Sequence, residues 1–161
     1  MGRSICIEER ALQAVKNFES GYNCSQSLFL AYADLFDLPP SLANQLSVSF
    51  GGGVGRMREI CGAVSAMSML IGLHHPESVA DDMKTRIQIY TAVQEASSRF
   101  KEKYNSIICK KLLSKTEAAK REPIPSLRTT EYYAKRPCSK YIAEAACIIG
   151  KILSEEIKPV I

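Results

Sequence analysis

Apolar residues recur every three or four positions along almost the whole chain, and this spacing limits the fold more than any other feature. The pattern is typical of amphipathic α-helices, in which residues three and four apart share one face. It predicts helices over residues 4–19, 24–36, 41–48, 56–73, 78–104 and 137–157, with a shorter one around Cys109. No stretch alternates between apolar and polar residues as a half-buried strand does. We therefore expect an all-α protein, a single-domain bundle of about six helices.

Length and composition fit one such domain. The chain has 161 residues, of which 46% are hydrophobic and 24% are charged, values typical of a globular protein with its own core. We expect residues 1–161 to form one helical domain, in which the polar segment 115–136, with its prolines, is an irregular connection. Residues 56–73 are strongly apolar and rich in small side chains, so we expect this helix to lie at the centre of the bundle.

Charge and hydropathy argue against several kinds of partner. The 21 basic and 17 acidic residues leave a formal net charge of +4, which is too small to indicate nucleic-acid binding by itself. No apolar run approaches the ~20 residues of a membrane span. The N-terminal segment lacks the apolar stretch and cleavage site of a signal peptide. We therefore expect a cytoplasmic protein with no nucleic-acid or membrane partner.

Four glycines fall within the five positions 51–55, directly before the expected central helix. Such a run does not form a stable helix interior, and it predicts a turn with positive φ angles or the close approach of another segment. Because the loop could offer backbone N–H groups, Gly52, Gly53 and Gly55 are candidate cofactor-binding residues. The Gly-Lys-Ser/Thr sequence of a phosphate loop does not follow. We expect instead that the glycines allow a helix end or an ion to approach Cys61.

The six cysteines are the main functional signal. A reducing cytosol disfavours structural disulfides, so the thiols are expected to be core residues, metal ligands or redox groups. Four fall near predicted helix starts: Cys24, Cys61, Cys109 and Cys138. The free N–H groups and dipole of a helix N-terminus favour the thiolate and lower the thiol pKa. Positive charge on Arg56 and Arg58 would lower the pKa of Cys61 further.

The chain resembles the C-GCAxxG-C-C family of redox-active proteins in three segments followed by two cysteines. These are Gly21-Tyr22-Asn23-Cys24-Ser25-Gln26, Phe50-Gly51-Gly52-Gly53-Val54-Gly55, Cys61-Gly62-Ala63-Val64-Ser65-Ala66, Cys109 and Cys138. The resemblance extends from Ala11 to Leu153 and implies a redox or metal-binding function. It assigns the family's four cysteines to the four at helix starts, and it leaves Cys6 and Cys147 outside the pattern.

Three kinds of function follow from these residues. In the first, the four cysteines converge as ligands of an iron–sulfur cluster or zinc, or as thiol–disulfide partners of a redox protein, with Cys24 and Cys61 as candidate catalytic thiols. In the second, they are core residues of a non-catalytic interaction module, a homodimer. In the third, a nucleophilic cysteine uses His74 or His75 as its base. We favour the first, which includes an oxidoreductase acting by thiol–disulfide exchange or electron transfer.

No C-x-x-C motif is present, so thioredoxin-type and zinc-knuckle sites are absent from the sequence. Any site shared by Cys24, Cys61, Cys109 and Cys138 has to be assembled by the packing of separate helices.

Overall fold

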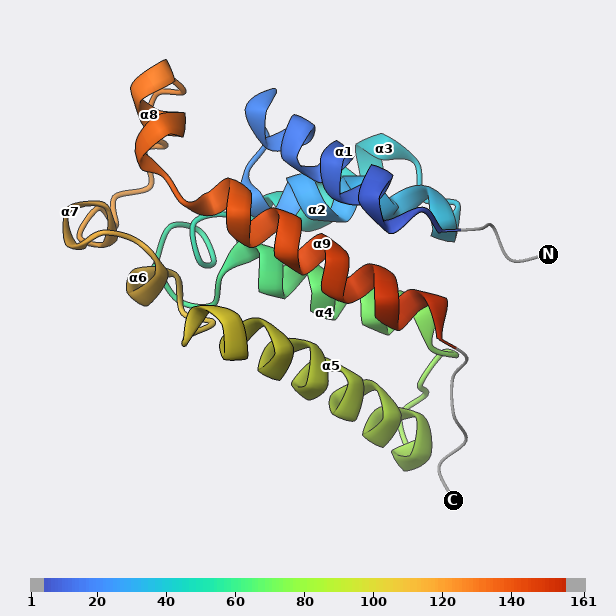
Figure 1. Ribbon diagram of the computed structural model, residues 1–161. Helices are drawn as coiled ribbons and strands as arrows, with labels where there is room; N and C mark the ends of the chain where they lie inside the picture. The colour runs from blue at the N-terminus through green and yellow to red at the C-terminus, as the bar shows by residue number, and fades with distance from the viewer. Residues whose placement is uncertain (1–4, 156–161) are drawn as a thin grey trace.

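The computed structural model describes residues 5–155, which form a bundle of packed helices (Figure 1). The longer helices are α1 (Ile7–Glu19), α2 (Cys24–Tyr32), α3 (Pro40–Ser47), α4 (Gly62–His74), α5 (Met83–Tyr104) and α9 (Cys138–Ser154). Short elements lie between them: 3-10 turns η1 (Ala33–Phe36) and η2 (Val48–Phe50), and helices α6 (Cys109–Leu112), α7 (Lys115–Ala118) and α8 (Thr130–Lys135). Over residues 5–155 the only strand-like pairing is one isolated bridge between Ile60 and Ile108. The predicted all-α fold is confirmed.

Helix α4 lies in the middle of the bundle, where it packs against α2, α5 and α9 (Figure 1). Its small residues Gly62, Ala63 and Ala66 are buried, which confirms the prediction of a central helix rich in small side chains. Short side chains let neighbouring helix backbones approach closely, and here the neighbours belong to the same chain. Within the described residues, no helix has both the length and the hydropathy needed to span a membrane.

Two helix starts are defined by local chemistry. The Asn23 side chain accepts a hydrogen bond from the backbone N–H of Gln26 at 2.9 Å. In return, the Gln26 side chain accepts one from the Asn23 backbone N–H at 3.1 Å. This reciprocal capping box places Cys24 at the first position of α2. At the other end of the chain, Pro137 precedes Cys138, the first residue of α9.

The central helix begins at Gly62, and the prediction that it begins at residue 56 was wrong. Val54, Arg56 and Arg58 have φ angles of 61°, 64° and 63°, which belong to the left-handed region. Backbone N–H groups here bond back into the glycine run, as from Arg58 to the Gly52 carbonyl at 3.2 Å. Residues 51–61 therefore form a compact loop instead of a first helical turn.

Two apolar faces expected from residue spacing are covered only in part: a stripe in residues 78–104 that contains Met83, Ile87, Tyr90, Val93, Ala96 and Phe100, and an inward face in residues 41–48 formed by Leu42, Ala43 and Leu46. In α5, which begins at Met83 instead of residue 78, Ala96 and Phe100 are buried, but Met83, Ile87 and Tyr90 are exposed. In α3, Ala43 is buried, whereas Leu42 and Leu46 point outward. Amphipathic spacing identifies an apolar face, but only the packing decides whether a neighbour covers all of it.

The remaining helix bounds differ at their ends. The first helix begins at Ile7, and Ser4, where it was predicted to start, lies outside the described residues. The second changes from α-helix to 3-10 geometry after Tyr32. The last described helix ends at Ser154, and Ile157, its predicted end, also lies outside the described residues. Segment 115–136, predicted as an irregular connection, contains the short helices α7 and α8.

Candidate functional site

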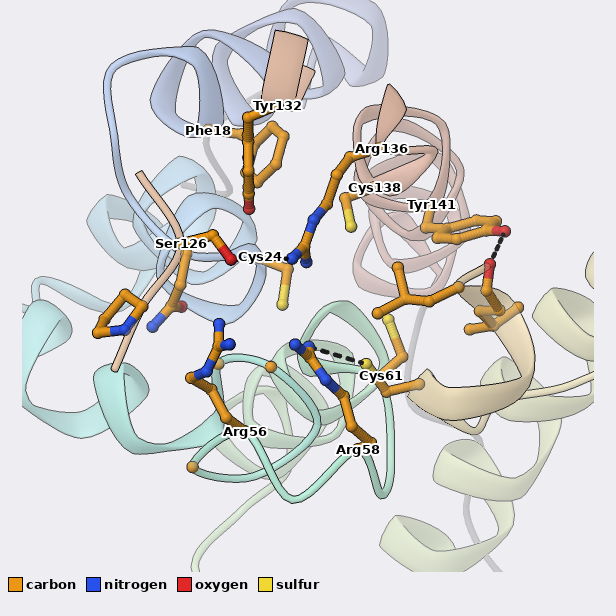
Figure 2. A pocket seen from close by; sticks show the side chains of 18 of the residues that line it. Phe18, Cys24, Arg56, Arg58, Cys61, Ser126, Tyr132, Arg136, Cys138 and Tyr141 are labelled. Carbon is orange, nitrogen blue, oxygen red and sulfur yellow. Dashed lines mark hydrogen bonds between the residues drawn. The ribbon is translucent and has the colours of Figure 1, made fainter. Parts of the chain in front are cut away.

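The four cysteines at helix starts line a single cavity of about 340 Å³ (Figure 2). Cys24, Cys109 and Cys138 are the first residues of α2, α6 and α9, and Cys61 is the N-cap of α4. All four are free thiols. The structure thus brings together the four sulfur-bearing residues that the sequence singled out. Cys147, in the middle of α9, and Cys6, before α1, do not line this cavity.

Glycines allow these helix starts to meet. A Cβ atom on Gly62 would lie 2.4 Å from the Sγ of Cys24, so the missing side chain lets α2 contact α4. A Cβ atom on Gly53 would lie 2.6 Å from the Cβ of Cys109. The sequence predicted that the glycine run lets another segment approach Cys61. The structure has a close approach at Gly53, but it involves Cys109 instead of Cys61.

The candidate cofactor-binding glycines take up the conformation expected of them. Gly52, Gly53 and Gly55 have φ angles of 66°, 70° and 55°, which favour glycine. Gly52 and Gly55 line the cavity, whereas Gly53 packs against Cys109.

Backbone hydrogen bonds place Cys61 beside Cys109. The Cys61 N–H donates to the Ile107 carbonyl at 2.8 Å, and the Cys109 N–H donates to the Glu59 carbonyl at 2.6 Å. The end of the glycine loop and the start of α6 therefore run side by side.

Burial raises the thiol pKa at three of the four cysteines, against the expectation from helix dipoles. The pKa of Cys138 is raised to about 12, first by burial and then by Cys24, although the charge of Arg136 acts in the opposite direction. Burial and the neighbouring Cys24 and Cys138 raise the pKa of Cys61. Burial also raises the pKa of Cys109. The prediction of lowered pKa values was wrong here, because removal from water outweighs the helix start.

Arg58 contacts Cys109 instead of Cys61. Its Nη1 lies 3.8 Å from the Cys109 Sγ, and this hydrogen bond lowers the pKa of Cys109 against the larger effect of burial. The predicted effect of Arg56 and Arg58 is not among the largest influences on the pKa of Cys61, which are burial, Cys24 and Cys138.

Four arginines line the cavity with the cysteines: Arg56, Arg58, Arg128 and Arg136. The guanidinium of Arg136 lies over the Tyr132 ring, 4.6 Å from its centroid. Arg128 also lies over Tyr132, at 4.8 Å. Sequence reasoning missed Arg128 and Arg136 because their segment has no helical periodicity. Two features of the sequence could have identified them: both arginines lie close to Tyr132, and Arg136 directly precedes Pro137 and Cys138.

The connection after α7 forms one wall of the cavity through Pro123, Pro125 and Ser126. Arginine side chains hold it in place: Arg56 Nε donates to the Glu122 carbonyl at 2.8 Å, and Arg58 Nε donates to the Lys120 carbonyl at 3.1 Å. The segment is therefore part of the site as well as a link between helices.

The thiols surround the cavity without converging on one point. Over residues 5–155, no three Cys, His, Asp or Glu side chains lie close enough together to hold a metal ion. The described residues therefore do not fit a zinc ion bound by three or four of these thiols.

The histidines lie away from the cysteines. His74 is the last residue of α4, and Cys61 caps its opposite end. A helix of 13 residues is about 20 Å long, so neither His74 nor the adjacent His75 can act as a base for Cys61. His75 instead places its Nδ1 2.9 Å from the Ile71 carbonyl oxygen, at the end of the helix.

Comparison with known protein families identifies the family of the chain. A family model described as "Putative redox-active protein (C_GCAxxG_C_C)" matches residues 22–152. The chain belongs to this family. The matched range contains all four cavity cysteines of this C-GCAxxG-C-C protein and excludes Cys6. No curated protein and no solved structure matches the chain.

Proposed function

We propose that this C-GCAxxG-C-C protein is a thiol-based oxidoreductase whose cavity cysteines exchange electrons with a disulfide substrate. One observation carries the proposal: Cys24, Cys61, Cys109 and Cys138, which are far apart in sequence, line one cavity. Cysteines that serve only as core residues of separate helices are not expected to line the same cavity. The family description, which names redox activity, supports the same conclusion.

Cys24 is the attacking thiol in this proposal. It is half-buried, whereas Cys61 and Cys109 are buried, so a substrate in the cavity can reach it. Its thiolate attacks one sulfur of the substrate disulfide, which forms a mixed disulfide and releases the other sulfur as a thiolate that takes up a proton.

Cys61 is the resolving thiol. The Cys24 sulfur contacts Gly62, the residue next to Cys61, so the two thiols are neighbours. Cys61 attacks the Cys24 sulfur of the mixed disulfide, and its proton passes to the departing substrate thiolate. Two electrons have then moved to the substrate, which leaves as two thiols, and Cys24 and Cys61 are joined as a disulfide. A dithiol on a redox partner protein reduces the pair again. Cys109 and Cys138 are further redox-active thiols on the same cavity.

Zinc bound as a single ion is not part of this proposal, because no three of the described Cys, His, Asp or Glu side chains gather around one point. No specific observation favours the homodimeric interaction module. The small residues Gly62, Ala63 and Ala66 are buried within the chain, so they are not available to a second copy.

The test begins with protein purified without oxygen and analysed for metals. The reduced protein is then exposed to a small neutral disulfide, and its linked peptides are mapped by mass spectrometry. We expect a Cys24–Cys61 disulfide that dithiothreitol reverses. It should form equally in a Cys147→Ser control and be absent from Cys24→Ser.

Two outcomes would overturn the proposal. The first is that no disulfide forms among the four cavity cysteines. The second is that the protein carries stoichiometric zinc or iron that is lost in Cys24→Ser, which would make these thiols metal ligands.

A further inference from the structure

Three arginines around the thiol cavity keep buried donor atoms without an acceptor. Among residues 5–155, these atoms are Nη2 of Arg56, Nη2 of Arg58 and Nε of Arg136. Arg58 is 0% exposed, and the Arg136 side chain is 7% exposed. Leaving a buried donor unpaired destabilises the folded protein, and more strongly when the group is charged. Such groups in a folded protein call for an explanation.

The three guanidinium groups converge on one place. Arg56 and Arg58 rise from the glycine loop, while Arg136 descends from the opposite side, just before α9 (Figure 2). All three point into the cavity toward the sulfur of Cys24. The unpaired donors therefore belong to one site, and whatever accepts their hydrogen bonds would sit beside the attacking thiol.

The carboxylates near the cavity do not balance its positive charge. Glu122 lies 3.7 Å from Arg56 Nη2, beyond hydrogen-bond distance. Glu117 pairs with Arg136, but it also pairs with Lys120. Within the described chain, Arg58 forms no ion pair with a carboxylate, and its other donors bond to a backbone carbonyl and to a thiol.

The positive charge of the cavity affects the pKa of Arg56, whereas the pKa of Arg136, which burial would lower, is raised by Tyr132, Cys138 and Glu117. Burial lowers the pKa of Arg56, and the charges of Arg58 and Arg136 lower it further. The surrounding thiols do not supply negative charge, because the raised pKa values of Cys61, Cys109 and Cys138 keep them protonated at neutral pH.

We propose that the cavity binds an oxyanion group through Arg56, Arg58 and Arg136, and that the substrate of the neighbouring thiols carries such a group. Guanidinium forks match the oxygen atoms of carboxylate, phosphate and sulfate. The cavity, at about 340 Å³, is at the small end of ligand pockets, so the ligand is a small molecule. The anion site is inferred from the three arginines and does not depend on the thiol chemistry. Only its role in substrate selection rests on the proposed function.

Charged and neutral alkylating reagents test the site on the intact, reduced protein. Iodoacetate carries a carboxylate, whereas iodoacetamide is neutral and reacts with the same thiols. The rate of each at Cys24 is measured by mass spectrometry, in native protein and in urea. We expect the iodoacetate-to-iodoacetamide ratio at Cys24 to be about tenfold higher in native protein, because nearby guanidinium charges attract the anion at low effective dielectric.

Variants assign the effect to the arginines. Arg56→Gln is the main one, because Arg56 is less buried than Arg58 and its removal leaves Arg58 in place; Arg136→Gln is the second. Both should lower the native ratio several-fold. Arg99→Gln, on the far helix α5 and paired with Glu95, should leave it unchanged. Circular dichroism and thermal melting confirm that each variant is folded.

Competing anions identify the source of the oxyanion. Inorganic phosphate that protects Cys24 better than acetate indicates a phosphate or sulfate group, and the reverse indicates a carboxylate. Equal protection by chloride at the same ionic strength would reduce the effect to screening and overturn the site.

The two proposals can fail separately. An unchanged reagent ratio between native and unfolded protein refutes the anion site, even where the Cys24–Cys61 disulfide forms. A raised ratio without that disulfide keeps the anion site and refutes the redox function.

Discussion

Replacing Gly62 by alanine tests how the thiol site is assembled. Gly62 is the first residue of α4. A Cβ atom there would lie 2.4 Å from the Cys24 Sγ and 2.9 Å from the Phe50 carbonyl oxygen. Favourable contact distances between such atoms are about 3.5–4.0 Å, so the new methyl group overlaps both neighbours. Rotation of the Cys24 side chain could relieve the first overlap, but the second is with the backbone.

The expected loss of stability is about 1–2 kcal/mol. Inserting a methyl group into a packed site costs about 1–3 kcal/mol. Alanine recovers roughly 0.5–1 kcal/mol of this, because it restricts the unfolded chain and favours the helix. The start of α2 cannot easily move away, since the Asn23–Gln26 capping box fixes it.

Urea unfolding of Gly62→Ala and Gly72→Ala measures the effect. Gly72 lies in the same helix with nothing within 4 Å of its added Cβ, so Gly72→Ala should be more stable than wild type by about 0.5–1 kcal/mol. If Gly62→Ala is stabilised to the same extent, α2 and α4 do not meet at this glycine and the packing argument fails.

Three further predictions follow from individual contacts. Gly53→Ala should destabilise the fold by about 1–2 kcal/mol more than Gly55→Ala in urea unfolding. Both have positive φ, but only Gly53 has atoms within 3 Å of the added Cβ, from Cys109, Glu59 and Arg58, so equal losses would contradict this. Burial raises the pKa of Cys138 from 9.0 to about 12, so the folded state holds this proton more tightly. The part of the free energy of unfolding that this shift contributes is fully present below pH 9 and is lost as pH rises toward 12. Under reducing conditions, Cys138→Ala should make the fall in stability over this range smaller, and an unchanged fall would contradict the prediction. Tyr32→Phe should cost about 1 kcal/mol in thermal unfolding, because the buried hydroxyl donates to a carbonyl oxygen of α9 at 2.8 Å, and a melting temperature equal to wild type would show that this bond contributes nothing.

Helix positions followed from sequence wherever local chemistry decides them. Periodic apolar residues predicted every longer helix, and the starts predicted at residues 24 and 137 lie within one residue of the starts of α2 and α9, where Asn23 and Pro137 precede the helices. The same reasoning failed at 56–61, because Arg56 and Arg58 have positive φ and their backbone N–H groups bond back to Gly51 and Gly52. Periodicity does not carry that information.

The outward positions of Leu42, Met83 and Ile87 have a related cause. Spacing shows that a helix has an apolar face, but burial depends on the neighbour that covers it. That neighbour comes from a distant part of the chain, and no local window contains it.

The sequence by itself determined the helical class, the family and the four cysteines at helix starts, because capping, glycine content and apolar spacing act over a few residues. Only the tertiary structure decided what surrounds the sulfurs. The environment of Cys138 depends on a cavity wall from segment 115–136, which has no regular pattern, and burial there raises thiol pKa values that the helix starts alone were expected to lower. Arg58 and Arg136 face each other because the glycine loop and the start of α9 lie on opposite sides of that cavity. Desolvation and charge depend on distances between atoms far apart in the chain, and folding alone sets those distances.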